Sequence, residues 1–141
     1  MKGIIVDASV AIKWFIPEIH AISAVRLLHQ NLHLLAPELI FAEVGNILWK
    51  KWRRNELPLD TANAILNDFR ALPLNTYKDE TLLDIAWQIA TQYQRSVYDS
   101  LYLALAQSEG CLFVTADQAF YNALQHTPLS TLLLWVEDIK G

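Results

Sequence analysis

Residues 111–117 have the sequence CLFVTAD and contain the run that decides the fold. The first five of them are apolar or β-branched and show no alternation with polar residues, which is typical of a strand covered on both faces. Residues 132–136 (LLLWV) have the same character, residues 3–7 (GIIVD) and 32–35 (LHLL) are further strand candidates, and residues 74–77 (LNTY) are a weaker one. Strands that are buried on both faces occur mainly in parallel sheets with helices on each side.

Helical periodicity marks the segments between these runs. Their apolar residues recur at three- and four-residue spacing, as on the buried face of a helix. The predicted helices cover residues 20–30, 38–54, 59–72, 80–93 and 97–109. Strands that alternate with helices form right-handed βαβ crossovers. We therefore predict an α/β fold, a three-layer sandwich around a central, mostly parallel sheet.

The composition favours one globular domain over residues 1–141. Hydrophobic residues make up 53% of the chain and charged residues 18%, which excludes intrinsic disorder and favours a surface covered by a partner. The single cysteine, Cys111, excludes a disulfide framework and a cysteine-based zinc site. No apolar run reaches the roughly 18 residues of a membrane helix, and Asp7 interrupts the N-terminal one, so we expect neither a membrane span nor a signal peptide. The net charge of −4 argues against a general nucleic-acid-binding surface but leaves room for a local basic patch.

Acidic residues stand at the points where two predicted strands end. Asp7 follows the strand GIIV, and Asp117 follows CLFVT after one alanine. Ligands of open parallel sheets bind beyond the carboxyl ends of the strands, so we expect both side chains in the same crevice. Two further acids, Glu43 and Asp99, interrupt helical sequences that are otherwise apolar.

Four carboxylates in one crevice repel one another, and their pKa values rise unless a cation neutralises them. Hard oxygen ligands favour Mg²⁺ or Mn²⁺ over zinc. Such a site is typical of metal-assisted phosphodiester hydrolysis. Each acid also has a simpler interpretation: Asp7 and Asp117 as helix caps, Asp99 as part of a capping box that begins at Ser96, and Glu43 as a solvated helix residue.

Four motifs together resemble the PIN-domain ribonucleases, and most closely the VapC-type toxins of prokaryotic toxin–antitoxin pairs. The motifs are Asp7-x-Ser9, Glu43-x-x-Asn46-x-Leu48, Tyr98-Asp99-x-x-Tyr102-Leu103-Ala104-Leu105-Ala106 and Thr115-x-Asp117-x-x-Phe120. Their order and spacing agree over nearly the whole chain. The resemblance implies a Mg²⁺-dependent endoribonuclease that acts in the cytoplasm, forms a homodimer and is inhibited by a small antitoxin protein.

The resemblance also implies roles for individual residues. It assigns the acidic metal site to Asp7, Glu43, Asp99 and Asp117. The site would hold Mg²⁺, with Mn²⁺ able to substitute. Ser9 and Thr115 would orient ligands or water through their hydroxyls, and Asn46, one helical turn from Glu43, would reach the same crevice.

A basic segment lies at the end of the predicted helix over residues 38–54. It contains Lys50, Lys51, Arg53 and Arg54. These side chains are candidates for contacts with RNA phosphates, but cations also stabilise a helix C-terminus by themselves. Trp49 and Trp52 lie in the same segment and fit either a partner surface or the core.

Two rival functions remain open at this point. Phosphatases that form a phospho-aspartate also begin with a strand that ends in Asp, but they need a second Asp two residues later, where this chain has Ser9. The other rival is a PIN-like scaffold that binds RNA or protein without cleavage. The presence of all four acids argues against a scaffold, which gains nothing from their repulsion.

Overall fold

The computed structural model describes residues 2–141. Five strands in this part of the chain form one fully parallel sheet. Its strands are β1 (Lys2–Val6), β2 (Leu32–Pro37), β3 (Leu74–Tyr77), β4 (Leu112–Thr115) and β5 (Leu133–Trp135). The order across the sheet is β3-β2-β1-β4-β5, and every neighbouring pair is parallel. The predicted sheet is therefore confirmed. This includes β3, the strand with the weakest sequence signal, which pairs with β2 from Leu74 to Tyr77.

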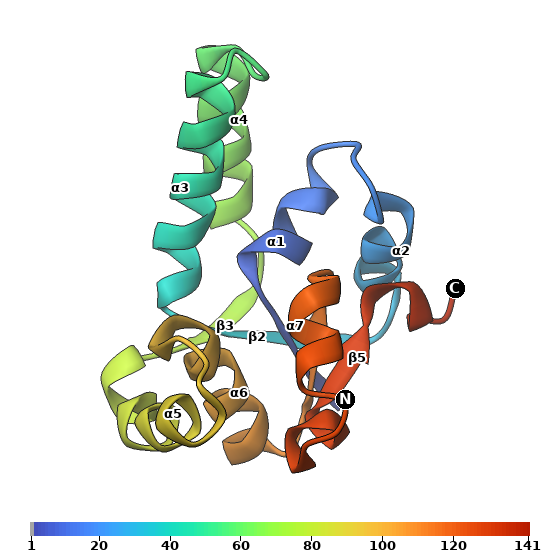
Figure 1. Ribbon diagram of the computed structural model, residues 1–141. Helices are drawn as coiled ribbons and strands as arrows, with labels where there is room; N and C mark the ends of the chain where they lie inside the picture. The colour runs from blue at the N-terminus through green and yellow to red at the C-terminus, as the bar shows by residue number, and fades with distance from the viewer. Residues whose placement is uncertain (1) are drawn as a thin grey trace.

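Seven α-helices connect and flank the described strands (Figure 1). They are α1 (Ala8–Ala11), α2 (Ala21–Val25), α3 (Leu39–Arg53), α4 (Leu59–Arg70), α5 (Asp79–Tyr93), α6 (Val97–Glu109) and α7 (Gln118–Ala123). Four of the five predicted helices match α3 to α6 closely. The predicted helix over residues 20–30 is only partly correct, because α2 passes into a 3₁₀-helix over Arg26–His29. No periodicity marks α1 and α7, because four and six residues are too few to show one.

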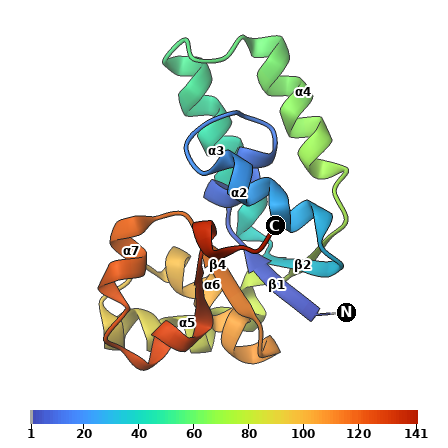
Figure 2. The same ribbon diagram turned by 90° about the vertical axis from the view of Figure 1, so that its right-hand side faces the viewer.

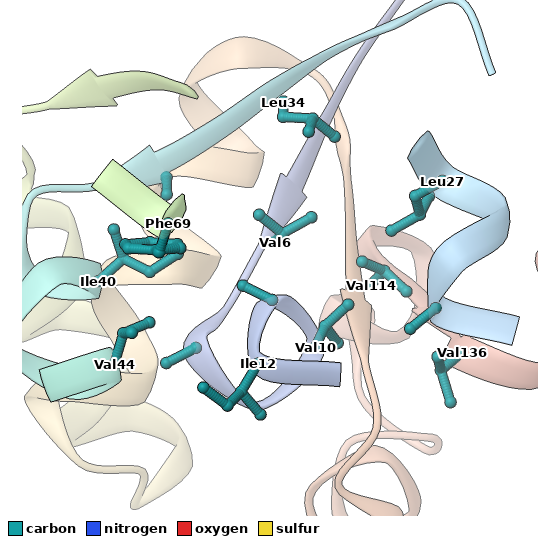
Figure 3. Close-up of a cluster of buried hydrophobic side chains, with 14 of the residues drawn as sticks. Val6, Val10, Ile12, Leu27, Leu34, Ile40, Val44, Phe69, Val114 and Val136 are labelled. Carbon is teal, nitrogen blue, oxygen red and sulfur yellow. The ribbon is translucent and has the colours of Figure 1, made fainter. Parts of the chain in front are cut away.

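The sheet has a hydrophobic core on each face. On one face Val6 of β1 and Val114 of β4 pack with residues of α1, α3 and α4, such as Val10, Ile40 and Phe69 (Figure 3). On the other face Ile5 and Phe113 pack with α5, α6 and α7. Successive residues of a strand point to opposite faces, so the consecutive apolar residues of β1 and β4 supply both cores. This arrangement is the predicted three-layer sandwich.

Two features of the topology position the site. From β1 the chain proceeds to β2 and β3 on one side of the sheet and later to β4 and β5 on the other, so the strand order reverses between β1 and β4. Ligand sites of parallel sheets lie at the carboxyl ends of the strands at such a reversal. Helices α3 and α4 contact each other as an antiparallel hairpin that extends beyond that end of the sheet (Figures 1 and 2).

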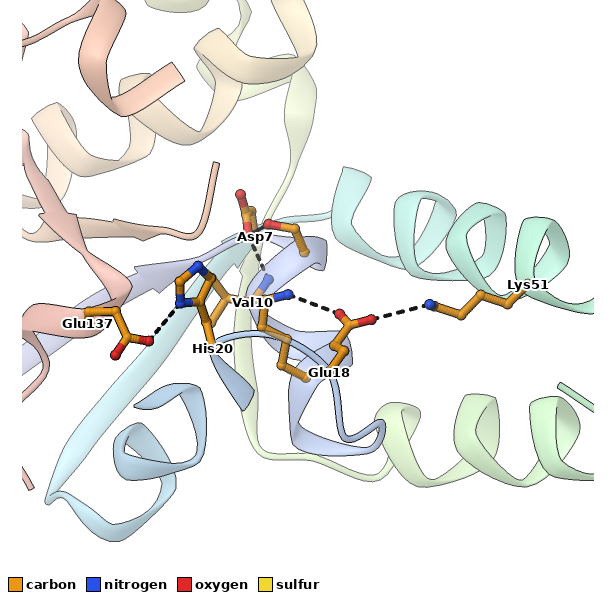
Figure 4. A network of polar contacts seen from close by, with 8 residues as sticks. Asp7, Val10, Glu18, His20, Lys51 and Glu137 are labelled. Atoms are coloured by element: carbon orange, nitrogen blue, oxygen red, sulfur yellow. Dashed lines mark hydrogen bonds and ion pairs between the residues drawn. The ribbon is translucent and has the colours of Figure 1, made fainter. Parts of the chain in front are cut away.

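The C-terminal segment is attached to the N-terminal half by polar contacts. Glu137 accepts a hydrogen bond from His20 Nδ1 at 2.6 Å (Figure 4). It also accepts one from Ser23 Oγ at 2.8 Å, so that α2 is joined to the residues after β5. No helix among residues 2–141 combines the length and the hydropathy that a membrane crossing requires.

Candidate active site

A cavity of about 690 Å³ lies at the carboxyl ends of β1 and β4. Its walls come from the turns after both strands, from α3 and from the start of α6. The polar residues that line it are Asp7, Ser9, Lys13, Glu43, Asn46, Lys50, Tyr98, Asp99, Tyr102 and Asp117. All four acids that the sequence singled out therefore face one space, although 36 to 110 residues of chain separate each of the others from Asp7.

Asp7 occupies the turn from β1 into α1. Its Oδ1 accepts hydrogen bonds from the Ser9 hydroxyl at 2.8 Å and from the Val10 backbone N–H at 2.9 Å, so Asp7 caps α1 (Figure 4). Burial nevertheless raises the pKa of Asp7 to about 6, and the nearby charges of Glu43 and Asp99 raise it as well. The capping interpretation is thus confirmed, but a cap alone leaves a carboxylate whose charge is poorly compensated.

Asp117 has the equivalent place after β4. It caps α7 by accepting a hydrogen bond from the Phe120 backbone N–H at 3.0 Å. The hydroxyl of Thr115, which is fully buried, accepts a hydrogen bond from the Asp117 backbone N–H at 3.1 Å. Thr115 therefore fixes the turn that carries Asp117 into the cavity and does not itself line the cavity wall.

Glu43 projects from α3 toward α6. Its Oε1 accepts a hydrogen bond of 2.5 Å from the hydroxyl of Tyr102, whose ring is buried and stacks on Phe113 of β4. Burial raises the pKa of Glu43, the Tyr102 hydrogen bond lowers it, and the charge of Asp99 raises it further. Glu43 is therefore not a freely solvated helix residue. Sequence analysis found Tyr102 only as a motif position and missed this contact.

Asp99 lies in the first turn of α6. The Ser96 side chain caps this helix by accepting a hydrogen bond from the Asp99 backbone N–H at 3.0 Å. Removal from water by the surrounding protein raises the pKa of Asp99, and the charge of Asp117 adds to this effect, while Ser96 and Arg95 lower the pKa. Three of the four acids therefore hold their protons more tightly than in water, mainly because of burial and with a contribution from neighbouring charges.

The donor set fits a hard divalent cation. The described residues that line the cavity offer four carboxylates and an asparagine and contain neither histidine nor cysteine. Oxygen donors of this kind select Mg²⁺ or Mn²⁺. Among residues 2–141, no three acidic, histidine or cysteine side chains are already gathered tightly enough to form a complete ligand set. Asp7 and Glu43 are held by their hydrogen bonds to Ser9 and Tyr102.

The basic segment of α3 divides into separate environments. Lys50 lines the cavity, whereas Lys51 donates a hydrogen bond to Glu18 Oε2 at 3.2 Å. Arg53 lies over the ring of Trp49, 5.4 Å from its centroid. Trp49 and Trp52 are 52% and 41% exposed, so the alternative that they pack in the core is wrong.

One charged residue of the cavity was missed entirely by sequence analysis. Lys13 lines the cavity although only 8% of its surface is exposed. A signal was present, because Lys13 stands in the apolar run AIKWF and lysines are almost never buried without a partner.

Comparisons with known proteins agree with this geometry. The PIN domain family model matches residues 4–123. Ribonuclease VapC3 of Pyrobaculum aerophilum is 34% identical over 119 residues, which cover 82% of this chain and 89% of the relative. The crystal structure of PAE2754 from P. aerophilum superposes with a TM-score of 0.69 at 24% identity, and the match covers 96% of this chain and 85% of that one.

A further solved structure is that of VapBC2 from Rickettsia felis bound to a DNA fragment from their promoter. It superposes with a TM-score of 0.65 at 14% identity and covers 94% of this chain and 98% of its own. At such low identity the two solved structures establish the shared fold, while the family model and the curated relative establish descent. The chain belongs to the PIN domain family, and a VapC ribonuclease is among its relatives.

Proposed function

We propose that this chain is a VapC-type endoribonuclease, the toxin of a toxin–antitoxin pair, and that residues 1–141 act as one nuclease domain that hydrolyses RNA phosphodiester bonds in the acidic cavity. The observation that carries the proposal is the convergence of Asp7, Glu43, Asp99 and Asp117 at the reversal of strand order. The VapC ribonuclease relative and the PIN family match support the same reaction.

The four carboxylates are the proposed ligands of Mg²⁺, with Mn²⁺ able to substitute. A divalent cation held there would supply charge for shielding the phosphate and for activating a water molecule. The protein positions the carboxylates: Ser9 holds Asp7, Tyr102 holds Glu43, and Thr115 fixes the turn of Asp117. Asn46, one turn after Glu43 on α3, is the proposed neutral hydrogen-bonding group of the same wall.

The expected partners follow from the same relationship. An antitoxin protein is supported by the structural neighbour VapBC2. We also propose a homodimer, action in the cytoplasm, and contact of Lys50, Lys51, Arg53 and Arg54 with RNA phosphates. The exposed Trp49 and Trp52 favour a protein contact on the outer part of α3.

Cleavage of single-stranded and structured RNA with Mg²⁺, with Mn²⁺ and with EDTA tests the nuclease. We expect endonucleolytic products with either metal and none with EDTA. Asp99→Asn should lower the cleavage rate at least about 100-fold. Removal of a residue that only hydrogen-bonds a metal ligand typically costs 10–100-fold, and loss of a ligand itself should cost more. Asp84→Asn, an exposed aspartate in the middle of α5, is the matched control. RNA binding without metal-dependent cleavage would favour the scaffold instead.

A further inference from the structure

Lys13 is a buried cation in the wall of the acidic cavity, and it takes no part in the proposed metal chemistry. It lies in a 3₁₀-helix over Ile12–Trp14, directly after α1, with 8% of its surface exposed. Its ammonium donates one hydrogen bond, to Glu18 Oε1 at 2.9 Å. Burial of a lysine costs free energy unless its charge serves a partner.

Glu18 bridges Lys13 and Lys51. While one carboxylate oxygen accepts the bond from Lys13, the other accepts a bond of 3.2 Å from Lys51 on α3 (Figure 4). Partial burial opposes ionisation of Glu18, but the hydrogen bonds and charges of Lys13 and Lys51 outweigh it and lower the pKa of Glu18. Two cations share one anion, so the cluster keeps an excess positive charge.

The free donors of Lys13 indicate an anionic ligand. An ammonium group has three N–H donors, and among residues 2–141 only Glu18 accepts from this one. Among residues 2–141, the carboxylate paired with Lys13 is that of Glu18, and none of the four cavity acids lies within ion-pair distance of its ammonium. A buried cation with unused donors therefore faces the cavity in which a phosphodiester is to be bound.

We propose that Lys13 binds a non-bridging phosphate oxygen of the RNA backbone beside the acidic site, and that Glu18 is the positioning residue that orients it. The inference rests on the proposed function. The acids would hold a divalent cation in the same cavity, and Lys13 would supply a second, fixed positive charge to the phosphate.

RNA affinity of Lys13→Met tests the contact. Fluorescence anisotropy with a labelled single-stranded RNA, in an Asp99→Asn background that prevents cleavage, should show roughly tenfold to hundredfold weaker binding. The slope of log K against log salt should become shallower by about 0.7, the value for one phosphate contact of a single strand. Lys13→Arg should recover part of the affinity. Lys2→Met is the control, because it removes an exposed lysine at the opposite end of β1. It should weaken RNA binding no more than the loss of one distant surface charge does.

The positioning role of Glu18 has its own test. Glu18→Gln should raise KM for RNA severalfold and leave kcat nearly unchanged, because Lys13 remains but is no longer held. In Lys13→Met protein the same Glu18→Gln change should raise KM clearly less, by no more than the release of Lys51 contributes, since interacting residues are not additive. A merely structural Glu18 would lower the melting temperature in both backgrounds equally and leave the ratio of KM to kcat unchanged.

The outcomes separate this inference from the function on which it rests. Wild-type affinity and an unchanged salt slope in Lys13→Met protein would overturn the phosphate contact and leave the nuclease standing. RNA binding that depends on Lys13 but is never followed by cleavage would support the contact and overturn the nuclease. Absence of RNA binding by the wild type would overturn both.

Discussion

The two ends of the sheet carry cavities of similar size but different lining. The cavity at the carboxyl ends of β1 and β4 measures about 690 Å³, and the one at their amino ends about 780 Å³. The first is lined by four acids and two lysines. The second is lined mainly by apolar residues such as Ile4, Leu27 and Leu134, together with Cys111 and a balanced set of two acids and two lysines.

Size alone therefore does not identify the functional site of this molecule. The difference arises from where the chain turns. At the carboxyl end, residues that cap α1 and α7 must be polar, and the reversal of strand order brings them together. At the amino end β1 is the first element and β4 begins after the end of α6, so neither start requires a cap at a helix N-terminus. An acid at one end should matter for activity, and an acid at the other should not.

The largest expected effect on activity comes from replacing an acid at the carboxyl end of the sheet, with an acid at the amino end replaced as its control. Asp7→Asn should reduce metal-dependent RNA cleavage by at least about 100-fold, because a direct ligand is lost. Asparagine caps helices as well as aspartate does, so α1 should persist. Asp138→Asn, in the cavity at the amino end, should keep its rate within about twofold. Equal losses in the two variants, measured as initial rates with circular dichroism as a check on folding, would break the comparison.

The acids at the carboxyl end should also lower the free energy of unfolding of the metal-free protein at neutral pH. Since the pKa of Asp7 rises from 3.8 to about 6, the folded state binds this proton more tightly than the unfolded state does. The free energy of unfolding should therefore fall as pH rises from about 4 to about 6, by on the order of 3 kcal/mol from this group. Glu43 and Asp99 shift in the same direction.

Urea denaturation in EDTA across this pH range measures the effect. Asp7→Asn should remove much of the fall, and Asp138→Asn should leave it in place. Parallel pH profiles for the wild type and Asp7→Asn would show that Asp7 has an ordinary pKa in the folded protein.

Tyr102→Phe should have a smaller effect on activity. Loss of the hydrogen bond to Glu43 should lower activity roughly 10–100-fold, as is typical when the partner of a metal ligand is removed. The hydrogen bond lowers the pKa of Glu43, so its loss should also shift the acid limb of the rate profile to higher pH. Tyr93→Phe, outside the cavity, is the control. An unchanged acid limb in Tyr102→Phe protein would contradict the positioning role.

The smallest effect on activity should come from glycine substitutions that change packing or helix stability. A Cβ on Gly3 would lie 2.5 Å from Leu35 Cδ1 and 3.0 Å from Cys111 Sγ, so Gly3→Ala should destabilise the protein by about 1–3 kcal/mol. Gly45→Ala meets nothing within 4 Å in the middle of α3 and should stabilise by about 0.5–1 kcal/mol. Both variants should retain wild-type kcat/KM at a temperature where they are folded. A large loss of activity in Gly3→Ala would show that the two ends are coupled.

These contrasts also show which parts of the structure follow from sequence. Four of the strands and α3 to α6 were predictable because unbroken apolar runs and helical periodicity are local signals, and the positions of Asp7 and Asp117 followed from the rule on strand ends. The contact between Tyr102 and Glu43 was not predictable, because the two residues are 59 positions apart and only the folded arrangement of α6 relative to α3 brings them together. The extended state of β3 was hard to predict from its sequence, because LNTY is only half apolar and its pairing with β2 decides its conformation.

Mn²⁺ titration followed by NMR tests the central claim most directly, namely that the acids at the carboxyl end form the metal site. A paramagnetic ion broadens nearby resonances, so ¹⁵N-labelled protein reports its position without any assay of cleavage. We expect early and selective broadening of the amides of Ser9, Val10, Glu43, Asp99 and Gln118, and its loss in Asp7→Asn protein but not in Asp138→Asn protein. Selective broadening around Glu109 and Asp138, or none at any site, would contradict the assignment.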